Sequence, residues 1–262
     1  MTFIDPLSRI LHHNAGRHGP IMLMYHAVQP GKVRPDWPWA VSMRRFKDQL
    51  DFLKAEGYAT PTMDELVSAP GIWPGRTAVI TFDDGYVDNA AACEELQKRD
   101  MRASWFIVTG SIGQPPRWPE DGRPAGRLLN SAELCDMQAN GMEIGSHTVS
   151  HARLTELDDL QLMQELSESK ATLENLLGNE VRSFAYPHGK WDTRCAQAAK
   201  RAGYSYACTT RTGWALRDND PYTLRRLTIL NGDTVSTFAR KLALSANDVT
   251  WHTLLRQRLI GR

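Results

Sequence analysis

Two adjacent carboxylates, Asp83 and Asp84, follow a run of β-prone residues at positions 78–82, and Gly85 comes next. This pattern predicts a buried strand that delivers its last side chains into a cleft. Two like charges side by side are costly to keep ionised away from water, unless a cation lies between them or each does different work. Because consecutive side chains of a strand point in different directions, one Asp could hold a metal while its neighbour moves a proton. The alternative is a strand-to-helix turn whose carboxylates cap the backbone.

Two histidines, His147 and His151, end another short β-prone segment, which begins at Gly141. Imidazoles four residues apart can face the same point and bind one metal ion. A histidine pair at this spacing also occurs on protein surfaces by coincidence. It is much rarer for a carboxylate pair and a histidine pair each to follow a predicted strand. Two histidines with one carboxylate leave an open coordination position for water, so the two pairs together predict a metal-dependent hydrolase.

A third strand-to-turn segment, residues 184–189, completes a set of motifs by which the chain resembles the polysaccharide deacetylase family, the NodB-like carbohydrate esterases. Residues 81–85 match the first motif of that family residue for residue. Residues 147–151 match its second motif, His-(Ser/Thr)-x-x-His. The third motif matches in part, in a Tyr-Pro-x-Gly form. The resemblance extends from about Pro20 to Leu244.

Predicted strands alternate with predicted helices along the chain, which favours βαβ units and a mostly parallel sheet. The family resemblance implies an α/β fold of a single domain, a distorted, incomplete (β/α) barrel with about seven parallel strands. We expect an N-terminal extension over residues 1–19, the catalytic domain over residues 20–244 and a basic amphipathic tail over residues 245–262. The motifs would then meet at the carboxyl ends of the strands, where parallel α/β folds place their sites.

The resemblance also implies a division of labour at the site. Asp84, His147 and His151 would hold a divalent metal, zinc first, with cobalt, nickel and manganese as alternatives. Asp83 would act as the general base, and the reaction would be hydrolysis of the N-acetyl group of a sugar by a metal-activated water. Attack of the water on the acetyl carbonyl gives a tetrahedral intermediate, whose oxyanion would lie between the metal and the backbone N–H of His188.

Other residues near the third motif are expected to contact the substrate. Tyr186 and Pro187 belong to the motif itself, and Trp191 lies in the turn that follows it, where its ring could stack on a sugar. The alternative for aromatic residues near strands is a place in the core. The long connection at residues 110–127 lacks an apolar period, and loops of this length are usually functional or mobile.

Two positions depart from the family pattern. Ala185 stands where the family usually has the arginine that orients the catalytic aspartate, and the nearby Arg182 need not face the same side of its strand. The strand predicted at residues 224–229 lacks the histidine that protonates the leaving amine in the family. We expect His26, at the end of the first predicted strand, either to supply this acid or to hydrogen-bond the aspartate pair. Branches of the family with a Tyr-Pro-x-Gly motif and an early Tyr-His pair share both departures.

The composition indicates which classes of partner and which cellular compartment to expect. The 262 residues carry a formal net charge of +1, which gives no electrostatic footprint for nucleic acid. The four cysteines form no C-x-x-C pair, so we expect reduced thiols.

Without a signal sequence or a bilayer-spanning apolar stretch, a cytoplasmic location is expected. The basic amphipathic run 249–259 is expected to pack on its own domain or a second subunit; contact with the inner face of the cytoplasmic membrane is the alternative.

Two other functions are compatible with these residues. A sugar-binding or scaffold protein of this fold that has lost catalysis would explain the missing arginine and acid, but not the intact aspartate and histidine pairs. A cyclic-imide or amide hydrolase of the same superfamily would differ in substrate alone. We therefore expect a metal-dependent carbohydrate N-deacetylase, while the sugar, its carrier (lipid, nucleotide or polymer) and the oligomeric state stay open.

Overall fold

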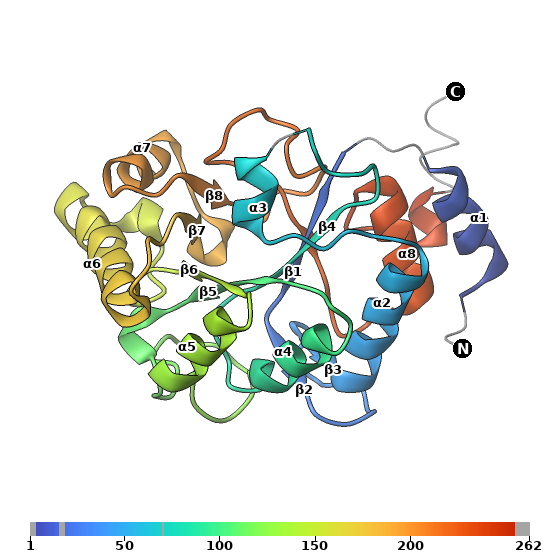
Figure 1. The fold of residues 1–262 in the computed structure, drawn as a ribbon, viewed down its shortest axis with the longest axis horizontal. Coiled ribbons are helices and arrows are strands. Elements are labelled where there is room, and N and C mark those ends of the chain that lie inside the picture. Colours follow the sequence, from blue (N-terminus) through green and yellow to red (C-terminus); the bar gives the residue numbers. More distant parts are fainter. Residues whose placement is uncertain (1–3, 16–18, 70, 255–262) are drawn as a thin grey trace.

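Seven parallel strands form the central sheet in the computed structural model shown in Figure 1. The structure describes residues 4–15, 19–69 and 71–254. The spatial order of the strands is β8, β7, β6, β5, β4, β1 and β9, and a smaller parallel pair is formed by β2 and β3. The expected α/β fold with about seven parallel strands is confirmed. The strand bounds are β1 Ile21–Tyr25, β2 Ala27–Gln29, β3 Ala40–Ser42, β4 Ala78–Phe82, β5 Ser104–Ile107, β6 Glu143–Ser146, β7 Ser183–Ala185, β8 Tyr206–Cys208 and β9 Leu227–Thr228.

The two edges of the central sheet are joined by the segment 224–228. Leu224 pairs with Cys208 of β8 in an isolated parallel bridge, and β9 pairs with β1. Because one short segment reaches both β8 and β1, the sheet curls into a distorted barrel instead of remaining open. Between the two pairings lies Arg226, which is completely buried.

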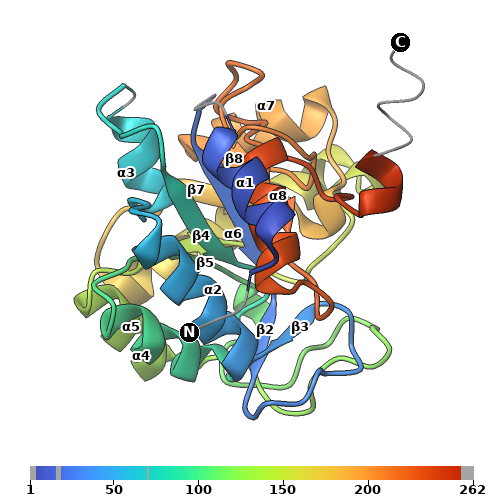
Figure 2. The same ribbon diagram turned by 90° about the vertical axis from the view of Figure 1, so that its right-hand side faces the viewer.

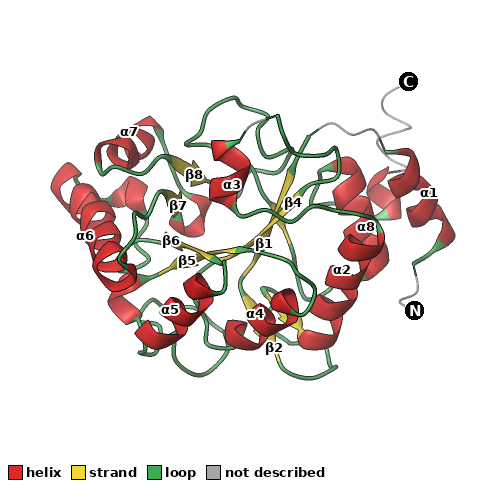
Figure 3. Cartoon of the chain, viewed as in Figure 1, coloured by secondary structure: helices red, strands yellow, loops and turns green. Residues whose placement is uncertain are grey.

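Helices pack around the sheet (Figure 3). Figure 1 places α6 and α7 at one end of the molecule and α1, α2 and α8 at the other. Short 3-10 turns follow several strands and lead into the loops at their carboxyl ends. The helix bounds are α1 Pro6–Asn14, α2 Met43–Ala55, α3 Met63–Ser68, α4 Asn89–Gln97, α5 Ser131–Ala139, α6 Asp159–Leu177, α7 Thr193–Arg201 and α8 Val235–Leu244, and the turns are η1 Thr109–Ser111, η2 Leu154–Glu156 and η3 Pro187–Gly189.

Side chains at the helix ends explain where several helices begin and stop. Asn130 accepts a hydrogen bond from the backbone N–H of Glu133, whose carboxylate accepts from the N–H of Asn130. Asp158 and Gln161 form the same reciprocal pair at the start of α6. Such capping boxes satisfy backbone donors that the first turn of a helix leaves free. At its other end α6 stops at Gly178, whose left-handed conformation (φ 69°) suits glycine.

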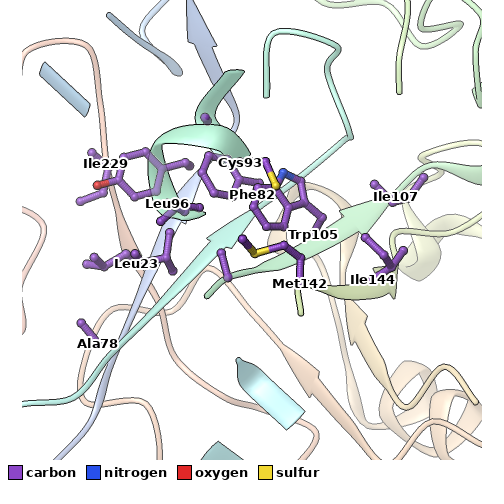
Figure 4. Packing of buried hydrophobic residues seen from close by; sticks show 14 of the residues in the cluster. Leu23, Ala78, Phe82, Cys93, Leu96, Trp105, Ile107, Met142, Ile144 and Ile229 are labelled. Atoms are coloured by element: carbon purple, nitrogen blue, oxygen red, sulfur yellow. The ribbon is translucent and has the colours of Figure 1, made fainter. Parts of the chain in front are cut away.

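The strands present their two faces to two different cores. On β4, Phe82 faces the helices and stacks on Trp105, with ring centroids 4.6 Å apart (Figure 4). Such an aromatic pair contributes about 0.5–1.5 kcal/mol beyond the burial of its area. Val79 faces the other way, into a separate apolar cluster. Because side chains alternate along a strand, Thr81 and then Asp83 also point toward this second side, the interior of the barrel.

The N-terminal helix α1 packs beside α8 (Figure 2). Arg240 of α8 donates hydrogen bonds to the Ser8 hydroxyl at 2.6 Å and to the Val249 carbonyl oxygen at 2.8 Å. Segments before and after residues 20–244 therefore both contact the body of the protein. Of the predicted C-terminal run 249–259, residues 255–259 lie outside the described residues. No helix in the described part of the chain has the length and hydrophobicity needed to cross a membrane.

Candidate active site

A cavity of about 360 Å³ opens at the carboxyl ends of the strands. Its walls come from the ends of β1 and β9 and from the residues that follow β4, β6, β7 and β8. The aspartate pair and the histidine pair both face this cavity, as the placement of the motifs at strand ends predicted. The lining residues are Met24, His26, Trp39, Asp83, Asp84, Glu120, His147, His151, His188, Gly189, Thr210 and Thr228.

Three of these side chains bring metal-donor atoms together. Asp84 Oδ1 lies 3.5 Å from Nε2 of His147 and 3.3 Å from Nε2 of His151. The donor atoms of all three residues lie within 4.8 Å of one another, and all three side chains are buried. Asp84 Oδ1 is buried and has no hydrogen-bond partner among the described residues.

The protonation states of these groups suit a cation at the point where they converge. Nδ1 of His147 lies 2.8 Å from the carbonyl oxygen of Ala185, so this nitrogen carries the proton. Burial lowers the pKa of His147 to about 4, which leaves the imidazole neutral near pH 7 with an electron pair on Nε2. Burial alone would raise the pKa of Asp84, but the neighbouring histidines, His151 foremost, hold that pKa well below its ordinary value. A neutral imidazole and an ionised carboxylate are forms that bind divalent metals, so His147 and Asp84 fit a metal site.

The loops that carry these side chains are conformationally strained. Asp84 (φ 71°), Thr148 (φ 70°), His151 (φ 63°) and His188 (φ 57°) all lie in the left-handed region although none is glycine. A residue held in such a sparsely populated region costs on the order of 1–3 kcal/mol. The strain is concentrated where the donor atoms converge, so the surrounding structure has to hold these loops in place.

Asp83 is held by a buried arginine from another strand segment. Arg226 Nη1 donates to Asp83 Oδ1 at 2.6 Å, and Nη2 donates to Oδ2 at 2.8 Å. Two further N–H groups of the guanidinium donate to the carbonyl oxygen of Thr209 at 3.0 Å and to the hydroxyl of Thr81 at 3.1 Å. Burial alone would raise the pKa of Asp83, but Arg226, and after it His147, lower that pKa below its ordinary value. The carboxylate of Asp83 is therefore ionised and fixed in orientation.

The arginine beside Asp83 does not come from the third motif. Ala185 occupies that position, and Arg182 donates to Asp64 at 2.8 Å, in a separate cluster from Asp83. Arg226 lies in the predicted strand 224–229, which lacks the expected histidine, and it was not among the predicted site residues. A partial signal was present, because Leu224, Leu227 and Ile229 indicate a buried segment, and an arginine whose side chain points inward there needs a buried anion.

His26 lines the same cavity as the aspartate pair. Its ring lies between Trp37, with ring centroids 6.1 Å apart, and Trp39, with centroids 5.0 Å apart. Nδ1 of His26 is buried and has no hydrogen-bond partner among the described residues. No hydrogen bond joins the His26 ring to either aspartate in the described part of the chain, so the ring is available to a bound molecule.

The residues of the third motif are divided between the cavity and the core. His188 lines the cavity, and its ring centroid lies 4.4 Å from that of His151. Tyr186 and Pro187 are buried and lie outside the cavity lining. Trp191 also lies outside the lining, beside Tyr186, with ring centroids 6.1 Å apart. Substrate contact by Trp191 stays a prediction.

The long connection 110–127 contributes two side chains that the sequence did not single out. The ring of Trp118 lies 4.6 Å from that of His151, centroid to centroid. Trp118 Nε1 donates to Glu120 at 3.4 Å, and Glu120 lines the cavity. Burial, and after it the charge of Asp84, raise the pKa of Glu120. The length of the loop predicted a role, but not which of its side chains turn inward.

A family model and a curated relative both indicate one family. A sequence model described as polysaccharide deacetylase matches residues 72–207. The chain is 31% identical over 221 residues to YxkH of Bacillus subtilis (strain 168), a protein named as a polysaccharide deacetylase, and the match covers 83% of this chain and 74% of that protein.

Solved structures of deacetylases share the fold. The Streptococcus pyogenes deacetylase PplD in complex with acetate has a TM-score of 0.73 and 25% identity, over 85% of this chain and 97% of that one. BC0361, a polysaccharide deacetylase from Bacillus cereus, has a TM-score of 0.72 and 26% identity, over 85% of this chain and 68% of that one. The two structural matches cover 85% of this chain, and the family model covers the aspartate pair and the histidine pair.

The buried ion pair predicts a pH-dependent effect on stability. Arg226→Met leaves the Asp83 charge buried without a partner, which should lower the free energy of unfolding by about 3–5 kcal/mol near pH 7. In the native protein the depressed pKa of Asp83 contributes stability above the unfolded-state pKa, near 4, and this contribution is lost as the pH falls through the folded-state pKa. The deficit of the variant should therefore shrink as the pH falls below about 4, through the folded-state pKa of Asp83. Urea unfolding of metal-free protein at several pH values measures both effects.

The neighbouring arginine provides the control. Arg225 pairs with Asp218 through two hydrogen bonds and donates a third to the Thr212 carbonyl oxygen, but neither side chain is completely buried, so Arg225→Met should cost less than Arg226→Met. Equal losses for the two variants, or a deficit of Arg226→Met that grows on acidification, would contradict the assignment of the pair.

Proposed function

The chain belongs to the polysaccharide deacetylase family, and we propose that it hydrolyses the N-acetyl group of an N-acetylated sugar with the help of a divalent metal. One observation carries this proposal: the donor atoms of Asp84, His147 and His151 converge in the same cavity as the ionised Asp83. A similar deacetylase was solved in complex with acetate, the acid that such a reaction releases.

The motif residues that line the cavity then have separate tasks. A divalent ion bound by Asp84, His147 and His151, zinc in the first place, would polarise the acetyl carbonyl and acidify a water molecule. Asp83 takes a proton from the attacking water as the water oxygen bonds to the carbonyl carbon. Because Arg226 engages both oxygens of Asp83, the carboxylate keeps one orientation through this step.

Collapse of the intermediate requires a proton for the leaving nitrogen. The C–N bond breaks as this nitrogen accepts a proton, and the products are acetate and a free amino sugar. His26 supplies that proton in the proposal, because its ring lines the cavity beside Asp83 and Asp84. The backbone N–H of His188 would stabilise the oxyanion, since the residue lies at the cavity wall beside His151.

The position of Arg226 beside Asp83 weakens the alternative hypothesis of a sugar-binding protein without catalysis. That hypothesis drew support from an absent arginine, and an arginine is present in the segment just before β9. Acetate release across nucleotide-linked, lipid-linked and polymeric N-acetylhexosamines would identify the carrier of the sugar. The cytoplasmic location stays a prediction from the sequence, which cell fractionation tests.

Substitution of Asp83 and substitution of Asp84 should affect different properties of the enzyme. Asp83→Asn should retain the metal and lose rate by a factor of about 10² to 10⁴, because it removes the general base and leaves the donor set intact. Asp84→Asn should lose affinity for the metal itself, as should His147→Ala. Metal content by elemental analysis, set beside the rate of acetate release, separates the two cases. Equal metal content in Asp83→Asn and Asp84→Asn would rule out this division of labour.

The role proposed for His26 predicts a change in the pH profile. Loss of a true acid in His26→Ala should remove the alkaline limb of the kcat profile, because that limb reports deprotonation of the acid. A residue that only supports the aspartates would instead lower the rate or the metal affinity at every pH. His13, an exposed histidine on α1, gives the control, and His13→Ala should leave the profile unchanged. If His26→Ala behaved like His13→Ala, the acid would have to be another residue.

A further inference from the structure

The loop between the two histidine ligands is held by a residue outside the cavity. Glu165 lies on α6 and is separated from this loop by 15 residues or more along the chain. Its Oε2 accepts hydrogen bonds from the backbone N–H groups of Val149 at 2.8 Å and Ser150 at 2.9 Å. Its Oε1 accepts from the hydroxyl of Ser150 at 2.5 Å. One carboxylate therefore binds three donors of the loop.

The opposite side of the same loop is held by the turn η1. The backbone N–H of Thr109 donates to the carbonyl oxygen of Thr148 at 3.0 Å, and that of Gly110 donates to the carbonyl oxygen of Val149 at 2.8 Å. A Cβ at Gly110 would come within 2.6 Å of the same oxygen, so glycine is required for this approach. The loop carbonyls are thus bound by η1, and the loop amides by Glu165.

These contacts matter because the loop conformation is unfavourable by itself. Thr148 and His151 both adopt positive φ without being glycine. Within the loop, the N–H of His151 donates to the hydroxyl of Thr148 at 3.0 Å, which links the two strained residues to each other. A segment with two such residues has other accessible conformations, and in most of them the imidazoles of His147 and His151 would not converge.

We propose that Glu165 is a positioning residue for the metal site. By binding the amides of Val149 and Ser150, it selects the loop conformation in which Nε2 of His147 and of His151 both face Asp84. The assignment rests on the proposed function, in that it takes these residues to be metal ligands. Hydrogen-bonded groups behind a ligand set commonly change metal affinity by about 10- to 100-fold when they are removed.

Zinc affinity measures this role directly, without reference to activity. We would determine the Kd for Zn²⁺ by competition with a chromophoric chelator in the wild type, Glu165→Ala, Glu165→Gln and Glu168→Ala. Glu168 is the matched control, because it lies on the same helix, is exposed, and bonds to Gln164 instead of the loop. Glu165→Ala is expected to bind zinc about 10- to 100-fold more weakly than the wild type, and Glu168→Ala to bind it equally well.

The conservative variant and the metal-free proteins distinguish positioning from general destabilisation. Glu165→Gln keeps one acceptor oxygen for the loop amides, so its affinity should lie between those of the wild type and Glu165→Ala. The unfolding temperature of the metal-free protein should change little between the variants, although their zinc affinities differ. The Co²⁺ absorption spectrum of Glu165→Ala should also differ from that of the wild type, because the ligand geometry relaxes.

The outcomes separate the two hypotheses. Equal zinc affinity in Glu165→Ala and Glu168→Ala would overturn the positioning role and leave the metal site standing. Failure of the wild type to bind zinc, cobalt or another divalent ion would reject the metal site, and the role of Glu165 with it. Should Glu165→Ala not fold, Glu165→Gln decides: wild-type affinity overturns the proposal, and weakened affinity supports it.

Discussion

The buried ion pair between Asp83 and Arg226 ties the architecture to the chemistry of the site. Removing two charges from water costs several kcal/mol per ion, and their attraction offsets this cost only when the geometry is good and further hydrogen bonds are made. Here the guanidinium also bonds the Thr209 carbonyl and the Thr81 hydroxyl. It can do so only because the segment 224–228 is fixed between β8 and β1. The segment 224–228 therefore has two roles: its backbone closes the barrel, and the side chain of Arg226 orients the ionised Asp83.

The two adjacent aspartates avoid mutual repulsion because each has its own environment. Asp83 continues the inward face of β4 and is neutralised by Arg226. Asp84 adopts a positive φ and turns toward the two histidines, where its Oδ1 is buried without a hydrogen bond among the described residues. A divalent cation at that point would neutralise the second charge. The strain in this turn and in the histidine loop is therefore consistent with a fixed geometry for ligand binding, with Glu165 and η1 supporting it from outside.

Much of this arrangement could be predicted from the sequence, and the limits of prediction have physical causes. Asp83, Asp84, His147 and His151 were recognisable because each pair is local and follows a predicted strand. Arg226 was not, because it lies 143 residues from Asp83, and nothing in the spacing shows that two segments so far apart meet inside a barrel. Inward-facing side chains of the long loop, such as Trp118 and Glu120, depend on a loop path that has no periodic signal. Tyr186 illustrates a different limit of prediction. It belongs to a motif beside the site and was expected to contact the substrate, but its side chain is buried in the core.

Metal-dependent acetate release is the most direct test of the central claim. Protein stripped with a chelator would be titrated with zinc in the presence of an N-acetylated sugar oligomer, while acetate and newly formed free amines are both counted. The account predicts no release without metal, a rise that saturates near one ion per chain, and equal amounts of acetate and amine. Undiminished release from the stripped protein, or no release at full metal occupancy across the substrate classes, would contradict it.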